Sequence, residues 1–125
     1  MADFTEKAKN YFISGAINEL INHLDVAASD YFKSLTAIND HILSRIDLFP
    51  KNHEERFEML RENFPISYKL ASSLFLTYRR AYTKEITLAE IQFLKEKIKE
   101  AFENAKIAIP TDDGVKEELK KALRE

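Results

Sequence analysis

The chain has 125 residues, enough for one domain with a hydrophobic core, and 45% of them are apolar while 32% are charged. Lysine and arginine total 19 against 21 aspartate and glutamate, and this net charge of −2 argues against a protein whose main role is coating duplex DNA. The absence of cysteine excludes disulfides, Cys-ligated zinc and thiol nucleophiles, and two glycines are too few for a dinucleotide fingerprint or a many-stranded barrel.

Apolar residues recur every three or four positions along most of the chain, which predicts helices rather than strands. The first helix is expected over residues 3–23, where Gly15 interrupts the apolar stripe and indicates either close approach of a neighbouring helix or a kink. The second helix is expected to begin at an N-cap formed by Asp25 and to continue to about Ile46. Pro50 breaks the pattern after it.

Two helices are expected in the middle of the chain. A short third helix should begin near residue 53, because Asn52 followed by Glu55 fits a capping box. Pro65 should end it and occupy the first turn of a fourth helix, whose apolar stripe continues to about residue 81.

The clearest start signal lies near the end of the chain. Thr87 and Glu90 fit a capping box, which predicts a fifth helix from there to about residue 105. Pro110 and the following Asp-Asp-Gly are expected to stop it. Residues 115–123 are expected to form a last, short amphipathic helix that depends on docking for its stability.

Together these elements predict an all-α fold, an antiparallel up-and-down helical bundle of four longer helices and one short helix with a C-terminal helical extension. The bundle is expected in residues 1–110 and the helical tail in residues 111–125. No apolar run is long enough to span a bilayer, and no signal-peptide pattern is present near the N-terminus, so a cytoplasmic protein is expected.

Motifs for catalysis and metal binding are missing from the sequence. The three histidines, His23, His41 and His53, complete neither a Glu-x-x-His nor a His-Glu-x-x-His pattern. Serines are plentiful, but no Gly-x-Ser-x-Gly elbow surrounds one. We therefore expect no metal, no cofactor and no catalytic residue.

One segment, residues 78–84, concentrates cations and phenols just before the fifth helix. It predicts a site for phosphate or RNA, because arginine binds phosphate through two parallel hydrogen bonds and phenol rings can stack on bases. The candidate ligand-binding residues are Arg79, Arg80, Tyr82 and Lys84. The alternative is an exposed helix end, with Tyr78 in the core and the cations near the negative end of the helix dipole.

Three stretches of the chain resemble HEPN domains, small helical proteins of prokaryotes that are often encoded beside minimal nucleotidyltransferases. They are the Asp-containing segment DVAASDYFKSLTA at 25–37, the link PKNHEERF at 50–57, and the Arg-containing segment LTYRRAYTKEIT at 76–87. The resemblance covers residues 4–109 and implies a helical bundle that usually dimerises and acts around RNA and nucleotides.

Many proteins of that family are metal-independent endoribonucleases, including toxins of toxin–antitoxin pairs, and their active site is an arginine followed by histidine after four to six residues. Arg79 or Arg80 matches the arginine, but no histidine occurs anywhere after His53. The resemblance therefore implies a non-catalytic, HEPN-like homodimer that binds nucleotide, RNA or a nucleotidyltransferase partner. The alternatives are an endoribonuclease with an altered acid/base and an unrelated helical interaction module with no ligand.

Overall fold

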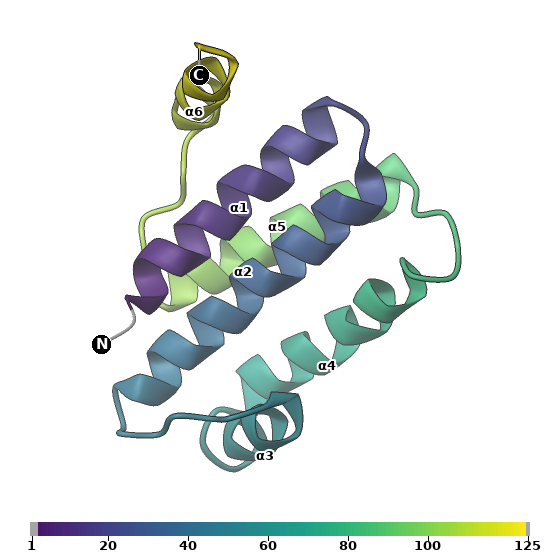
Figure 1. Ribbon diagram of the computed structural model, residues 1–125. Helices are drawn as coiled ribbons and strands as arrows, with labels where there is room; N and C mark the ends of the chain where they lie inside the picture. The colour runs from purple at the N-terminus through teal and green to yellow at the C-terminus, as the bar shows by residue number, and fades with distance from the viewer. Residues whose placement is uncertain (1–2, 125) are drawn as a thin grey trace.

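The computed structural model describes residues 3–124, and this part of the chain folds into helices joined by short loops, with no strand (Figure 1). The predicted all-α fold is therefore confirmed. No helix in the described part is both long and apolar enough to cross a bilayer. The helices are α1 (Phe4–Leu20), α2 (Leu24–Ser44), α3 (His53–Asn63), α4 (Pro65–Arg80), α5 (Leu88–Asn104) and α6 (Asp112–Arg124).

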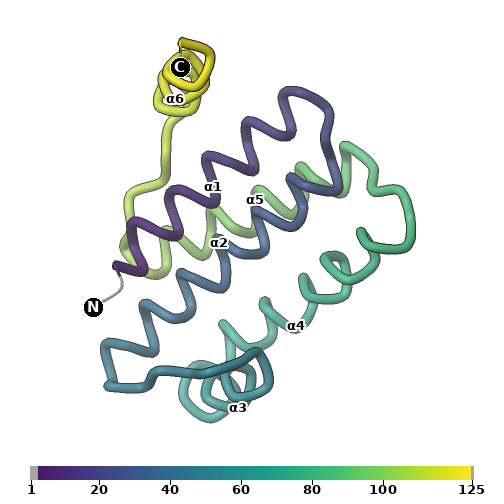
Figure 2. The backbone as a smooth tube through the Cα atoms, viewed as in Figure 1, coloured from purple at the N-terminus to yellow at the C-terminus, as the bar shows by residue number. Residues whose placement is uncertain are grey.

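Helix α2 is the centre of the bundle and contacts α1, α3, α4 and α5. Its most extensive contacts are with α1, followed by those with α5, and α4 packs along it on the other side (Figure 2). The short helix α3 lies across the start of α4. Helix α6 stands apart at the end of an extended segment, and its principal contact is with α1.

Several predicted helix starts are confirmed, and each depends on residues close together in sequence. The Asn52 side chain accepts a hydrogen bond from the Glu55 backbone at 2.8 Å, and Pro65 occupies the first turn of α4. Thr87 and Glu90 form both hydrogen bonds of the capping box of α5. Caps of this kind satisfy backbone groups that have no partner within the helix, so they locate a helix start without any tertiary contact.

Two predicted boundaries are wrong. Helix α2 begins at Leu24, before the expected cap Asp25, because Asn22 adopts a left-handed conformation with φ of 62° and turns the chain within a very short loop. Asp25 therefore lies in the first turn, where the helix dipole favours its negative charge. The Asp-Asp-Gly sequence at 112–114 forms the first turn of α6, and the Thr111 hydroxyl accepts a hydrogen bond from the Gly114 backbone at 3.0 Å.

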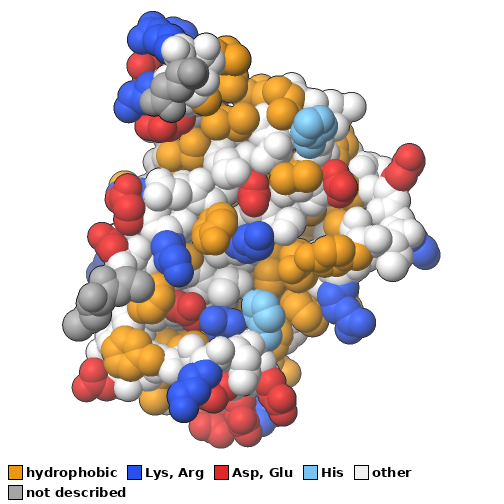
Figure 3. All heavy atoms as spheres, in the orientation of Figure 1, with side chains coloured by type: hydrophobic (Ala, Val, Ile, Leu, Met, Phe, Trp, Pro, Cys, Tyr) orange, Lys and Arg blue, Asp and Glu red, His pale blue; other side chains and the backbone are white. Residues whose placement is uncertain are grey.

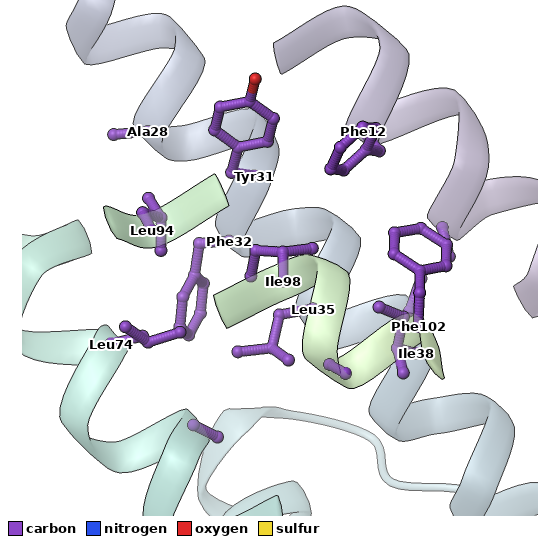
Figure 4. Packing of buried hydrophobic residues seen from close by; sticks show 14 of the residues in the cluster. Phe12, Ala28, Tyr31, Phe32, Leu35, Ile38, Leu74, Leu94, Ile98 and Phe102 are labelled. Carbon is purple, nitrogen blue, oxygen red and sulfur yellow. The ribbon is translucent and has the colours of Figure 1, made fainter. Parts of the chain in front are cut away.

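The hydrophobic core lies between α1, α2, α4 and α5 (Figure 4). Phe12 contacts Tyr31 at 5.4 Å and Phe102 at 5.5 Å between ring centroids. Tyr31 and Phe32 are 0% and 3% exposed, so this pair is part of the core of a single chain and contributes no surface to a dimer. The expected homodimer stays a prediction that must use other residues.

Apolar stripes extend beyond the core at the ends of three helices. Leu20, Ile66 and Leu123 belong to the apolar stripes of α1, α4 and α6, yet they are 63%, 81% and 80% exposed. The spacing of apolar residues identifies which face of a helix is apolar. How much of that face is buried depends on where the neighbouring helices end.

Gly15 is a point of close helix approach, as one of the two sequence alternatives predicted. A Cβ atom at this position would lie 2.7 Å from Cδ1 of Tyr31. Alanine at position 15 would improve helix propensity by about 1 kcal/mol, but forcing a carbon against a buried ring costs about 1–3 kcal/mol. We therefore expect Gly15→Ala to lower the free energy of unfolding, measured in urea.

Gly114→Ala is the matched control for this substitution, because its added Cβ would meet only the Thr111 hydroxyl, at 3.3 Å. It is expected to leave stability unchanged or raise it by up to about 1 kcal/mol. Equal stabilisation by both alanines would show that the Tyr31 ring moves aside freely.

Candidate functional site

A hollow of about 270 Å³ opens where α1, α2, the start of α3 and α4 meet. A second hollow shares Lys33 and Tyr78 with the first, and a third shares Asp25, Ala81 and Tyr82 with the second. Together the three form a groove along α2 and α4 to the loop before α5, which we call the α2–α4 groove. We call the first hollow the basic pocket; its charged and aromatic lining residues are Lys7, Tyr11, Phe32, Lys33, Asp40, His53, Arg56 and Tyr78. Figure 3 shows basic side chains and a histidine gathered over this face.

Two lysines give the basic pocket its charge. Lys7 on α1 and Lys33 on α2 are both exposed, and neither forms an ion pair with any residue that the structure describes. The Lys33 Nζ lies 5.8 Å from the centroid of the Tyr11 ring, within the range of a cation–π contact. Both ammonium groups can therefore bind an anion without breaking an existing ion pair.

A third cation of the pocket, Arg56, is already paired with a carboxylate. Its Nε lies 2.6 Å and its Nη2 3.2 Å from the two carboxylate oxygens of Asp40, and both side chains are largely buried. This bidentate pair links α3 to α2 and cancels its own charge. The net charge of the pocket thus comes from Lys7 and Lys33.

His53 lies at the rim of the pocket, at the first position of α3. Its Nδ1 is 2.9 Å from Nη1 of Arg56, and because a guanidinium can only donate, Nδ1 is the acceptor and the proton lies on Nε2. Partial burial, and to a smaller extent the charge of Arg56, lower the pKa of His53 below its ordinary value. The imidazole is therefore neutral at pH 7.

Aromatic rings form the floor of the groove. Phe32 and Tyr78 stack with their centroids 4.6 Å apart and their planes 12° from parallel. The Tyr78 hydroxyl lies 2.8 Å from the Tyr82 hydroxyl; this hydrogen bond, followed by burial, raises the pKa of Tyr78 to about 12. Tyr82 is 71% exposed, so its ring face is open for stacking by a planar ligand.

The middle of the groove is acidic. Asp25 and Asp30 both line it, and Asp30 accepts hydrogen bonds from Ser14 at 2.6 Å and Asn18 at 3.1 Å. An anionic group is therefore favoured in the basic pocket and disfavoured beside these carboxylates.

The residues predicted from sequence are divided between the groove and the surface outside it. Tyr82 lines the groove and Lys84 lines its far end. Arg80 forms an ion pair with Glu90, and the guanidinium of Arg79 lies 6.0 Å from the centroid of the Phe75 ring. Neither arginine lines the groove, and the phosphate-binding role of all four residues stays a prediction.

Sequence reasoning missed the basic pocket. Lys7, Lys33, His53 and Arg56 come from three helices, and each in its local sequence resembles an ordinary solvated position. The one available signal is that His53 and Arg56 directly follow Asn52 and Glu55, the residues that form the N-terminal cap of α3, so both lie at its start. Only the packing of α3 on α2 joins them to the lysines.

No protein-family model, no curated protein and no solved structure matches this chain.

Proposed function

We propose that this protein is a non-catalytic, HEPN-like domain that binds single-stranded RNA in the α2–α4 groove. The observation that carries the proposal is the presence of Lys7 and Lys33, both without an acidic partner among the described residues, in one hollow above stacked aromatic rings. Phosphate supplies most of the affinity of such complexes, and bases stack on aromatic faces.

The charges along the groove define an orientation for the RNA. A phosphate occupies the basic pocket between Lys7 and Lys33, and the base attached to it stacks toward Tyr82. The carboxylates of Asp25 and Asp30 keep phosphate out of the middle of the groove and can accept hydrogen bonds from exocyclic amino groups of a base. Lys84 is placed for a second phosphate at the far end.

The HEPN resemblance implies RNA or nucleotide as the phosphate-bearing ligand, and it extends the proposal to a homodimer that can pair with a nucleotidyltransferase. Exposed apolar side chains outside the groove, such as Leu20 and Leu123, provide surface for protein contacts. A protein that sediments as a monomer at high micromolar concentration would contradict the homodimer.

Binding of fluorescently labelled single-stranded RNA, followed by anisotropy across a salt series, tests the proposal. The double variant Lys7→Gln, Lys33→Gln is expected to weaken binding by roughly tenfold or more per lysine, since hydrogen bonds to charged groups are strong. The slope of log affinity against log salt should fall by about 0.7 for each phosphate contact that is lost.

The matched control is Lys116→Gln, Lys120→Gln, which makes the same change in net charge on exposed positions of α6, outside the groove. It should leave the affinity nearly unchanged. Arg79→Gln, Arg80→Gln tests the residues predicted from sequence in the same assay. Equal losses of RNA affinity in all three double variants would mean that binding depends on net charge and not on the groove. If the wild type binds no RNA at low salt, a helical interaction module with no ligand describes the protein better.

His53 favours one alternative function, metal-independent RNA cleavage, because a neutral imidazole at the rim of the basic pocket can exchange protons near neutral pH. Incubation of RNA with the protein and a chelator separates the two functions. Cleavage by the wild type that His53→Ala abolishes would make the non-catalytic proposal wrong.

A further inference from the structure

A separate hollow, of about 350 Å³, lies at the end of α2, the start of α4 and the end of α5. None of its lining residues belongs to the α2–α4 groove. Its walls are mostly apolar and include Ile38, Ile42, Phe64 and Leu70. We call it the apolar cleft, and its volume falls within the range of small-molecule sites.

The cleft exists because α4 and α5 both pack on α2 but contact each other only sparsely. The ends of α2 and α5 and the start of α4 lie toward the same end of the molecule (Figure 2). Ile66, in the first turn of α4, lines the cleft and is 81% exposed, so the cleft opens to solvent beside an apolar rim.

A buried amide lines this apolar cleft. Asn39 is only 3% exposed, and neither its amide oxygen nor its amide nitrogen has a hydrogen-bond partner among the protein groups that the structure describes. Among the described residues only Oε2 of Glu90 is both fully enclosed and unpaired, so the amide atoms of Asn39 reach the solvent that fills the cleft. Asn39 thus offers both a donor and an acceptor to an occupant of the cleft.

A cation is fixed near the other end of the cleft. The Nη2 of Arg45 donates a hydrogen bond to the Ala105 carbonyl at 2.9 Å, which holds the guanidinium across the ends of α2 and α5. Its remaining donors are without acceptors among the described residues, and no carboxylate lines the cleft. The cleft therefore favours an anionic group on its ligand.

We infer that the apolar cleft binds a small amphipathic carboxylate whose carboxylate pairs with Arg45 and whose far end carries a hydrogen-bonding group for Asn39. Asn39 on α2 and Arg45 at the C-cap of α2 are six positions apart, about 9 Å along the helix axis. In a molecule with a phenolic hydroxyl at one end of a benzene ring and a carboxylate on a two-carbon chain at the other, the hydroxyl and the carboxylate are a similar distance apart. The apolar body between them lies against Ile38, Ile42 and Leu70.

Three probes test this assignment by titration calorimetry and by backbone amide shifts in NMR spectra: para-hydroxyphenylpropionate, phenylpropionate and the amide of the first. The first probe is expected to bind and to shift amides of residues lining the cleft. Loss of the hydroxyl leaves Asn39 unpaired, so phenylpropionate should bind roughly tenfold more weakly. The amide lacks the charge that pairs with Arg45 and should lose a similar factor.

Three variants of the full chain test which residues cause these differences in probe affinity. Asn39→Leu, which is close in volume, should reduce the ratio between the affinities of the hydroxylated and unhydroxylated probes to near one. Arg45→Gln should remove the preference for the carboxylate over the amide, and Leu70→Trp should fill the cleft and abolish binding. Lys33→Gln, in the basic pocket, is the control and should change none of these affinities, which separates this result from RNA binding.

Two outcomes would overturn the inference. One is the absence of binding by the wild type at millimolar concentrations of every probe. The other is binding that Leu70→Trp and Asn39→Leu leave unaltered, which would place the probes elsewhere. If no probe binds and Ile66→Asp instead dissociates a dimer, the cleft is an interface between two copies of the chain.

Discussion

Phe102→Ala is expected to lower the free energy of unfolding by about 3–5 kcal/mol, the range for removing a fully buried phenylalanine. Phe102 is 0% exposed and packs edge-on against Phe12, with ring centroids 5.5 Å apart (Figure 4). It joins α5 to α1 across the core, and a close-packed interior can collapse only partly around the cavity that alanine would leave. Urea unfolding followed by circular dichroism measures the loss.

Phe93→Ala provides the comparison on the same helix. Phe93 is 57% exposed, and its ring contacts the ammonium group of Lys97 at 5.6 Å from the centroid. The expected change is within about 0.5 kcal/mol. If the two alanines shift the unfolding midpoint equally, the assignment of the buried face of α5 is wrong.

The second large effect is expected for Arg56→Ala. Arg56 and Asp40 keep only 13% and 14% of their side-chain surface exposed, and no other ion pair with Asp40 is present among the described residues. Removing the guanidinium leaves a largely buried carboxylate without its partner, which costs roughly 3 kcal/mol, at the low end for broken buried pairs. The loss appears as a lower urea midpoint.

The control for this prediction is Arg61→Ala, also on α3. Arg61 and Glu58 lie 4.0 Å apart with about three fifths of each side chain exposed, and solvent screens such a pair almost completely. It should leave the midpoint in place. If Arg56→Ala lowers the midpoint and Asp40→Ala, Arg56→Ala restores it, the unpaired carboxylate is the cause of the loss. A small effect of Arg56→Ala would contradict the prediction.

The sequence by itself determined the helices that have local start signals and one clear apolar face. Thr87 and Glu90 place the start of α5, and its apolar residues at three- and four-residue spacing, Ile91, Leu94, Ile98 and Phe102, are all buried. These features depend on interactions between residues three or four positions apart, so they can be predicted from about one turn of local sequence. The same holds for Pro65 at the start of α4.

The residues that line the basic pocket and the apolar cleft are brought together only by the tertiary structure. The basic pocket unites Lys7, Lys33 and His53 from three helices, and Asn39 lines the apolar cleft, where α4 and α5 contact each other only sparsely. The cations and phenols of residues 78–84 are contiguous in sequence, yet Arg80 pairs with Glu90 in the folded chain. Helix periodicity specifies which residues share a face, whereas the distances between faces depend on how side chains of several helices pack together, and no local pattern contains that information.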